Sequence, residues 1–246
     1  MGNDSRIDGV FFDLDGTLMD TASDFVFAVN QLLNDHRLPA INEQLIRDNV
    51  SSGSKKLASI ALNMAIDHPD IQKKNQQLLQ YYTARINNHN RAMPATLYSG
   101  VTALIQSLER HNIQWGIVTN KPEVYTKVLL KQVNLFTRSG SIVCPDHVSK
   151  SKPDPRGLLL ACKQTNCRPE NSIYIGDHQR DIEAGKRAGM LTIAAIYGYI
   201  GDDDGDPADW QADFQASSVG AIEQWLAQHN WKIKQSSFIN KAASVD

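Results

Sequence analysis

The chain has 246 residues, a formal net charge of −2 and a pI near 6.4, which gives no support for a nucleic-acid partner, since that calls for a basic face. Its longest nearly apolar stretch, residues 191–200, is too short to span a bilayer, and its first six residues lack the apolar region of a secretory signal. We therefore expect a cytoplasmic protein without a membrane partner. The three cysteines show no C-x-x-C spacing, so we expect free thiols, with Cys144 near the functional site.

The first predicted element is a buried strand, the apolar run from Val10 to Phe12. Such a run is typical of a parallel sheet covered on both faces, and ligands bind beyond the carboxyl ends of its strands. Asp13 and Asp15 stand at that end, where two close carboxylates repel each other unless a cation is bound or one is protonated. We expect Asp13 to be a Mg²⁺ ligand and a nucleophile, and Asp15 a general acid and base. A surface Asp-Gly turn is the alternative for this motif alone.

Residues 20–93 show helical periodicity and no convincing strand, which predicts an inserted helical domain. The core domain would then comprise residues 1–19 and 94–230, followed by a polar tail, residues 231–246. Acidic and basic residues are mixed along the insert, so nothing there indicates a basic docking surface.

Three helices are predicted within the insert. An apolar stripe from Phe25 to Leu33 predicts the first, and an apolar face between Lys55 and Met64 predicts the second. Pro69 begins the third, with the polar residues 72–77 as its solvated face.

From Gly100 onward, strands and helices alternate, which predicts an α/β core with a parallel sheet and right-handed crossovers. The predicted strands are residues 114–118, 141–143, 172–175 and 191–196. The predicted helices are residues 101–109, one that begins at Pro122, one that begins at Arg156, one that ends at Gly189, and 219–228. Residues 202–207 form an acidic loop that lacks the twelfth-position Glu and the flanking helices of a calcium loop.

Three more segments place groups suited to phosphoryl transfer near strand ends. The Thr119 hydroxyl and the backbone amides that follow, beginning with Asn120, can face a phosphoryl oxygen. The Lys152 ammonium can stabilise charge that develops in the transition state. Asp177 and Asp181, four residues apart at a helix start, can complete an oxygen-rich metal site. Each has a structural alternative alone, namely a buried Thr, a solvated Lys and helix-capping acids, but their joint occurrence favours one site.

The motifs D-x-D-G-T, T-N, K-P and G-D-x-x-x-D, in this order, resemble the haloacid dehalogenase superfamily of phosphatases as far as about Gln228. This resemblance implies a Rossmann-like core, a C1-type all-helical cap at residues 20–93, and Mg²⁺ as cofactor. It implies these roles: nucleophile, Asp13; acid/base and metal ligand through its backbone carbonyl, Asp15; phosphoryl donor, Thr119; charge stabiliser, Lys152; metal ligands, Asp177 and Asp181. Dehalogenating members lack the second acid, so Asp15 favours a phosphatase. His178 stands where many relatives carry a further Asp or Ser.

The segments V-T-N-K-P, S-K-P-D-P and G-D-x-x-R-D are most similar to phosphoglycolate-phosphatase-like proteins. Residues 144–148, 160–163 and 197–200 resemble the branch that removes phosphate from N-acetylmuramic acid 6-phosphate in bacterial cell-wall recycling. The predicted function is therefore Mg²⁺-dependent hydrolysis of a phosphomonoester through a phosphoaspartate, on N-acetylmuramic acid 6-phosphate or 2-phosphoglycolate, by a monomer or homodimer. Because the phosphate pocket is generic, the cap has to select the substrate, and Gly53 and Ser54 in a small-residue turn are our candidates.

Three alternatives remain open from the sequence. A sugar-phosphate mutase would return the phosphoryl group to its substrate instead of water. A phosphonatase would need a Schiff-base lysine, for which Lys55 and Lys56 are the candidates in the insert. A non-catalytic protein that binds a phosphorylated ligand is the third, because a fold does not fix a function.

Overall fold

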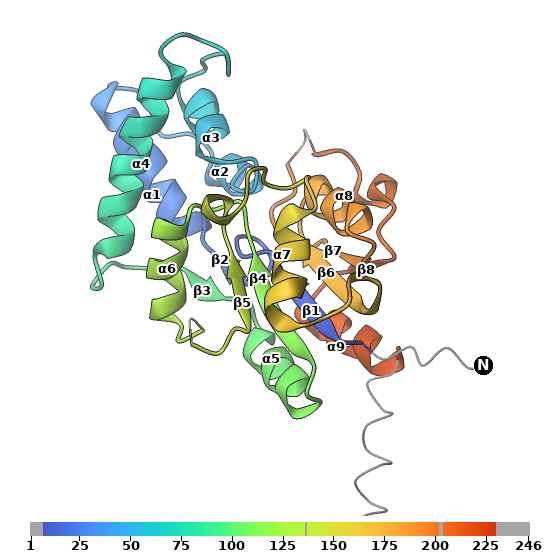
Figure 1. The fold of residues 1–246 in the computed structure, drawn as a ribbon. Helices are drawn as coiled ribbons and strands as arrows, with labels where there is room; N and C mark the ends of the chain where they lie inside the picture. Colours follow the sequence, from blue (N-terminus) through green and yellow to red (C-terminus); the bar gives the residue numbers. More distant parts are fainter. Residues whose placement is uncertain (1–6, 136, 202–203, 230–246) are drawn as a thin grey trace, which may run out of the picture.

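A computed structural model describes residues 7–135, 137–201 and 204–229 of the chain. Six parallel strands form one sheet in the order β5-β4-β1-β6-β7-β8 (Figure 1). The strands are β1 (Gly9–Phe12), β4 (Gln114–Val118), β5 (Ser141–Val143), β6 (Ser172–Gly176), β7 (Leu191–Ala195) and β8 (Phe214–Ala216). The predicted parallel-sheet α/β fold is confirmed. The predicted tail at 231–246 and the acidic residues 202–203 lie outside the described residues.

The central strand β1 lies between β4 and β6, and the register brings their carboxyl ends to one edge of the sheet. Phe12 pairs with Ile117 on one side and Ile175 on the other. Apart from the exposed Gln114 at the start of β4, these strands are buried and mainly apolar, as expected where helices cover both faces of a parallel sheet. The residues that follow these strands therefore begin side by side.

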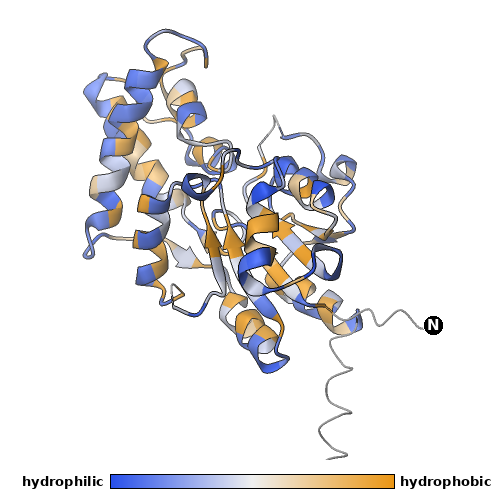
Figure 2. Ribbon diagram, viewed as in Figure 1, coloured by the Kyte–Doolittle hydropathy of each residue, from blue (hydrophilic) through white to orange (hydrophobic). Residues whose placement is uncertain are grey.

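Helices on both faces of the sheet enclose two apolar clusters. One cluster contains Phe12 and Ile175 and is covered by α5 (Val101–Arg110), α6 (Glu123–Gln132) and α9 (Val219–Gln228). The other contains Phe11 and Tyr174 and is covered by α7 (Arg156–Thr165) and α8 (Gln179–Arg187). Figure 2 shows the hydrophobic strands between helices whose outer faces are hydrophilic. This sandwich keeps the strand ends in place.

The helical insert lies to one side of the sheet, beside α6 (Figure 1). It consists of α1 (Ala22–Asp35), α2 (Glu43–Asp48), α3 (Ser54–Ala61) and α4 (Ile71–Asn87), with α1 packed against α4. A small antiparallel pair, β2 (Met19–Asp20) and β3 (Thr96–Leu97), joins its two ends to the sheet domain. The insert is thus connected to the sheet domain where its chain leaves and returns.

Several features of the insert and sheet differ from the sequence prediction. α2 and the pair β2–β3 were not predicted, because six- and two-residue elements are too short for a periodic signal. β8 was likewise missed. The second insert helix covers Ser54–Ala61 and not Lys55–Met64. The prediction that residues 72–77 form a fully solvated face is wrong at Asn75, which is only 8% exposed because it faces the packed side of α4.

Within the part of the chain that the structure describes, no helix is long and apolar enough to cross a membrane. All three cysteines are free, as predicted, and all three are buried.

Candidate active site

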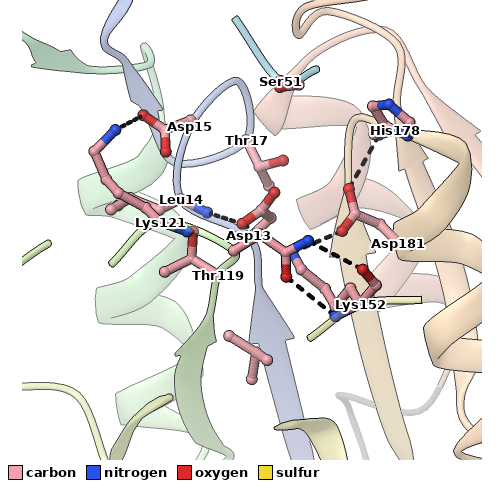
Figure 3. A network of polar contacts seen from close by, with 12 residues as sticks. Asp13, Leu14, Asp15, Thr17, Ser51, Thr119, Lys121, Lys152, His178 and Asp181 are labelled. Carbon is pink, nitrogen blue, oxygen red and sulfur yellow. Dashed lines mark hydrogen bonds and ion pairs between the residues drawn. The ribbon is translucent and has the colours of Figure 1, made fainter. Parts of the chain in front are cut away.

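Three buried carboxylates meet at the carboxyl edge of the sheet. Figure 3 shows two of them, Asp13 and Asp181. Asp13 directly follows β1, Asp177 directly follows β6, and Asp181 lies in the first turn of α8. Each offers an oxygen atom within 4.8 Å of the others, and none is more than 4% exposed. The three acids, which the sequence analysis placed at different strand and helix ends, therefore lie close together. Three oxygen ligands at this spacing can hold a hard metal ion.

The electrostatics of this cluster are unfavourable without a cation. Burial, followed by repulsion from the neighbouring acids, raises the pKa of Asp177 well above its usual range. Burial also raises the pKa of Asp13, although the Lys152 ammonium opposes the shift. Burial works against ionisation of Asp181 too, but the nearby Lys152 ammonium prevails and lowers the pKa of this carboxyl. A divalent ion would favour the ionised form of all three groups.

Lys152 lies between two of these acids, as Figure 3 shows. Its Nζ atom is 3.0 Å from Asp13 Oδ1 and 2.7 Å from Asp181 Oδ1, and it donates a hydrogen bond of 2.7 Å to the Tyr174 hydroxyl. The Asn120 side chain fixes the backbone of Lys152 through two hydrogen bonds of 3.1 Å. Its Oδ1 atom accepts from the Lys152 amide, and its Nδ2 atom donates to the Lys152 carbonyl. The predicted charge stabiliser is therefore held against the predicted nucleophile.

Asp15 turns away from the three-acid cluster toward Lys121. The Lys121 Nζ atom is 2.8 Å from Asp15 Oδ1, and the Thr21 hydroxyl donates to the same oxygen at 2.5 Å. The ammonium also lies 5.0 Å from the ring centroids of Phe25 and Tyr82 in the insert. Burial works against the charge of Lys121, but Asp15 prevails and raises the lysine pKa. The acid/base candidate is thus held by a buried ion pair.

Thr119 and the turn after β4 form the third wall of the site. Thr119 is buried, and its hydroxyl accepts a hydrogen bond of 3.1 Å from the Lys121 amide. A hydroxyl that accepts one bond keeps its own proton for another acceptor. Thr119 and Asn120 line the same cavity as Asp13 and Asp15, so the predicted phosphoryl donor lies beside the predicted nucleophile.

Asp177 is anchored by groups from three separate segments. Its Oδ2 atom accepts hydrogen bonds of 2.9 Å from the Ser51 hydroxyl and from the Tyr199 amide, and its Oδ1 atom accepts one of 3.3 Å from the Thr17 hydroxyl. Two glycines make room for it: a Cβ atom at Gly198 would lie 2.4 Å from Asp177 Cβ, and one at Gly16 would lie 1.9 Å from its Oδ2. Close packing therefore sets the position of this carboxylate.

Tyr199 connects the acid cluster to the start of the insert. While its amide binds Asp177, its hydroxyl accepts hydrogen bonds from the amides of Thr21, at 2.7 Å, and Ala22, at 2.9 Å. The same hydroxyl donates to Asp20 Oδ1 at 2.6 Å. These bonds satisfy buried amides at the start of α1 that have no partner within the helix.

A cavity of about 430 Å³ lies between the sheet domain and the insert. The sheet domain contributes Asp13, Asp15 and Thr119, and the insert contributes the turn before α3 and side chains of α1 and α4. Gly53 and Ser54, the predicted substrate-binding turn, line this cavity. Lys55 and Lys56, the Schiff-base candidates, are not among its lining residues.

Sequence reasoning missed the side chains of Lys121 and Arg180. Both line the cavity, and the Arg180 guanidinium donates to the Ser51 carbonyl of the insert. Each lies inside a motif that the sequence did single out, V-T-N-K-P or G-D-x-x-R-D. The presence of a basic residue inside each motif could have identified these two side chains as site residues.

Cys144 lies behind the site rather than in its cavity. It is buried beside Thr119 and Lys152 in a much smaller space, and burial raises the pKa of its thiol to about 11. His178 is 2.9 Å from Asp204 through its Nε2 atom, so it contacts an acid of a neighbouring loop.

The sequence of this chain is similar to those of known proteins. A family model described as haloacid dehalogenase-like hydrolase matches residues 10–195. The N-acetylmuramic acid 6-phosphate phosphatase of Pseudomonas aeruginosa is 40% identical over 208 residues, which are 85% of this chain and 89% of the relative. A phosphoglycolate phosphatase of Xanthomonas campestris is 37% identical over 83% of this chain and 89% of the relative.

Solved structures show the same fold. The crystal structure of a predicted phosphoglycolate phosphatase from Haemophilus somnus matches with a TM-score of 0.75 at 23% identity, over 92% of this chain and all of that one. A haloacid dehalogenase-like family protein from Streptococcus pneumoniae matches with a TM-score of 0.74 at 21% identity, over 89% and 98%.

Proposed function

This chain belongs to the haloacid dehalogenase-like hydrolases and is a phosphatase of that family, and we propose that it is a Mg²⁺-dependent phosphomonoesterase for N-acetylmuramic acid 6-phosphate. The observation that carries the mechanism is the buried carboxylate Asp13, held 3.0 Å from the Lys152 ammonium beside two further buried acids. The observation that carries the substrate is the cavity beyond it, whose far wall belongs to the insert.

The acid cluster fits a magnesium ion by its chemistry. Asp13, Asp177 and Asp181 are oxygen donors, which this hard cation prefers, and the raised pKa values of the first two show that their charges are poorly compensated by the protein. The Asp15 backbone carbonyl is the fourth ligand in our proposal. When bound, the ion would neutralise negative charge on the phosphoryl oxygens.

The side chains then divide the reaction into two displacements. An Asp13 oxygen attacks phosphorus and the bond from phosphorus to the ester oxygen breaks. Asp15, which enters this step protonated, gives its proton to the leaving alkoxide. Asp15 next removes a proton from water, which attacks the phosphoaspartate and releases inorganic phosphate, restoring Asp13. The Leu14 amide, 2.8 Å from Asp13 Oδ1, and Lys152 orient the nucleophile, while Lys152 and Thr119 offset the charge of the transferring group.

The size of the cavity favours a sugar phosphate over phosphoglycolate. Its volume of about 430 Å³ falls within the range of roughly 300–1,000 Å³ typical of pockets for whole small molecules, whereas glycolate has only two carbon atoms. Both candidate esters carry a carboxylate, and Arg180 on the cavity wall could pair with either one. Charge therefore does not favour one ester over the other. The names of the two phosphatases of Pseudomonas, 40% and 38% identical to this chain, support the same choice.

We propose that residues 20–93 act as a cap over the site. The insert supplies one wall of the cavity, and its Ser51 contacts both Asp177 and Arg180 of the sheet domain. A cap that closes over a phosphate ester excludes bulk water and reads the leaving group.

Measurement of kcat/KM over a panel of esters tests this function. With Mg²⁺, we expect N-acetylmuramic acid 6-phosphate to exceed phosphoglycolate by about tenfold or more, since ΔΔG‡ of about 1.4 kcal/mol already gives that ratio. Chelation with EDTA should stop turnover of every ester. A preference for phosphoglycolate would refute the substrate, conversion of hexose 1-phosphates to 6-phosphates would indicate a mutase, and absence of Mg²⁺-dependent turnover would refute the enzyme.

A further inference from the structure

Unpaired polar atoms collect on the wall of the cavity. Among the described residues, four buried side-chain nitrogen or oxygen atoms have no hydrogen-bond partner: Asn30 Oδ1, Asn75 Oδ1, the Tyr82 hydroxyl and Arg180 Nε. Three of the four belong to residues that line the cavity. A buried polar group without a partner is costly and rare in a folded protein, so this concentration points to a ligand that supplies the missing partners.

Of these three residues that line the cavity, Asn75 is the one with a carboxamide side chain, and it lies on α4 of the insert. The Tyr82 hydroxyl lies near the Lys121 ammonium, which opposes the rise of the tyrosine pKa, and the Arg180 guanidinium already donates to Ser51. Asn75 is 92% buried by contrast with Gln76 beside it, which is exposed. A single amide turned inward from a polar helix segment is therefore the unexplained feature.

The surroundings of Asn75 suit a sugar ring. Phe25 and Tyr82 stack on each other with ring centroids 4.2 Å apart and line the same cavity, as does Leu79. Every lining residue that the insert contributes is uncharged. Apolar and aromatic surface with a few convergent polar groups is the usual composition of a small-molecule site, in which the polar groups fix orientation.

We propose that the Asn75 carboxamide binds the acetamido group of a phosphorylated amino sugar and so determines specificity for it. An amide offers one acceptor and two donors, and a secondary acetamido group offers the matching donor N–H and acceptor C=O. The acetamido N–H would satisfy the unpaired Asn75 Oδ1. This inference rests on the proposed function and adds the residue that distinguishes an N-acetylated sugar from other phosphate esters.

The test compares Asn75→Leu with the wild type on three esters: N-acetylglucosamine 6-phosphate, glucose 6-phosphate and phosphoglycolate. Leucine keeps the approximate volume and removes both hydrogen-bonding groups. We expect kcat/KM to fall about 10- to 100-fold for the N-acetylated sugar, mainly through KM, and to stay within about twofold for the other two. Gln76→Leu, the same change at the exposed neighbouring position, should leave all three values unchanged.

The outcomes separate this inference from the proposed function. An equal loss on all three esters would assign Asn75 a structural role and overturn the inference, as would no loss on the N-acetylated sugar. Asn75→Ser, which retains a polar group, serves as a second variant if the leucine form fails to fold, and it should show the same selective loss. A wild type that hydrolyses phosphoglycolate but no amino-sugar phosphate would refute the proposed substrate itself.

Discussion

The two walls of the cavity differ in charge. The sheet domain contributes Asp13, Asp15, Lys121 and Arg180, and Lys121 is paired with Asp15. Asp13 is paired with Lys152, which does not line the cavity. We call these residues, together with the neighbouring acids Asp177 and Asp181, the charged wall. The insert contributes only uncharged lining residues, among them Phe25, Ser54 and Asn75. Phosphoryl transfer requires charge that is fixed in place, whereas discrimination among leaving groups requires shape and a few hydrogen bonds. The difference supports our proposal that the sheet domain carries the reaction and the insert carries the selectivity.

The largest effect is expected on the charged wall, from Asp13→Asn. Loss of the nucleophile should lower kcat by about 10⁴-fold or more for every ester, large or small, including a generic aryl phosphate. Steady-state assays with p-nitrophenyl phosphate would measure it, with the exposed Asp67→Asn as a matched control. Retained activity would show that the nucleophile lies elsewhere.

Without a metal ion, repulsion among the buried acids of the charged wall should make the thermal stability of the protein depend on pH. Because the folded-state pKa of Asp177 is raised, its contribution to stability is fully present below the unfolded pKa of about 3.9 and is lost as pH rises through the folded value. We therefore expect ionisation of Asp177 to lower the Tm of the metal-free wild type, relative to a variant without this carboxyl, as pH rises above about 4. Magnesium at about 100 times its Kd should restore about 2.7 kcal/mol.

Asp177→Asn is the control for this dependence. The variant lacks the titrating carboxyl, so the difference between its Tm profile and that of the wild type isolates Asp177 from Asp13 and Asp181. Differential scanning calorimetry at several pH values, with EDTA or with Mg²⁺, gives both profiles. Parallel profiles for the two proteins would contradict the role that we assign to this carboxyl.

Gly198→Ala should destabilise the charged wall without removing any polar group. Its Cβ atom would lie 2.4 Å from both Asp177 Cβ and the Gly16 carbonyl oxygen, so backbone or side chain has to move. We expect the free energy of unfolding to fall by about 1–3 kcal/mol, as in other overpacked sites. Urea denaturation would measure it against Gly220→Ala, where the nearest atom is at 3.8 Å. Equal stability of the two variants would contradict close packing at Gly198.

The smallest effect is expected on the uncharged wall, from Ser54→Ala. Loss of one hydroxyl should lower kcat/KM for a sugar phosphate by about three- to tenfold and leave an aryl phosphate within twofold, because one neutral hydrogen bond contributes about 1 kcal/mol. Ser217→Ala, at an exposed position away from the cavity, is the control. An equal loss on both esters would indicate that the uncharged wall also contributes to the chemical step. It would contradict the proposal that the two walls have separate roles.

The charged wall could be predicted from sequence, and the uncharged wall could not. Asp13, Thr119 and Asp177 each directly follow an apolar strand, and the rule that parallel strands share a carboxyl edge brings them together without any knowledge of packing. The inward turn of Asn75 depends on how α4 packs against α1, which no local pattern within residues 72–77 reveals.

Some contacts on the charged wall were also beyond sequence reasoning. Asp15 was correctly placed at a strand end. Its pairing with Lys121 occurs among Thr21 and two rings of the insert, which are contacts between distant segments. The two-residue strands β2 and β3 exist only because distant segments meet, so neither carries a propensity signal of its own.

Tyr199 connects the two walls of the cavity. Tyr199 holds Asp177 by its amide and the first turn of α1 by its hydroxyl, so the acid and the helix are tied to opposite ends of a single stiff side chain. A displacement of either end has to be passed to the other or break a short hydrogen bond. The position of Asp177 and the position of the first turn of α1 therefore depend on one another through a single residue.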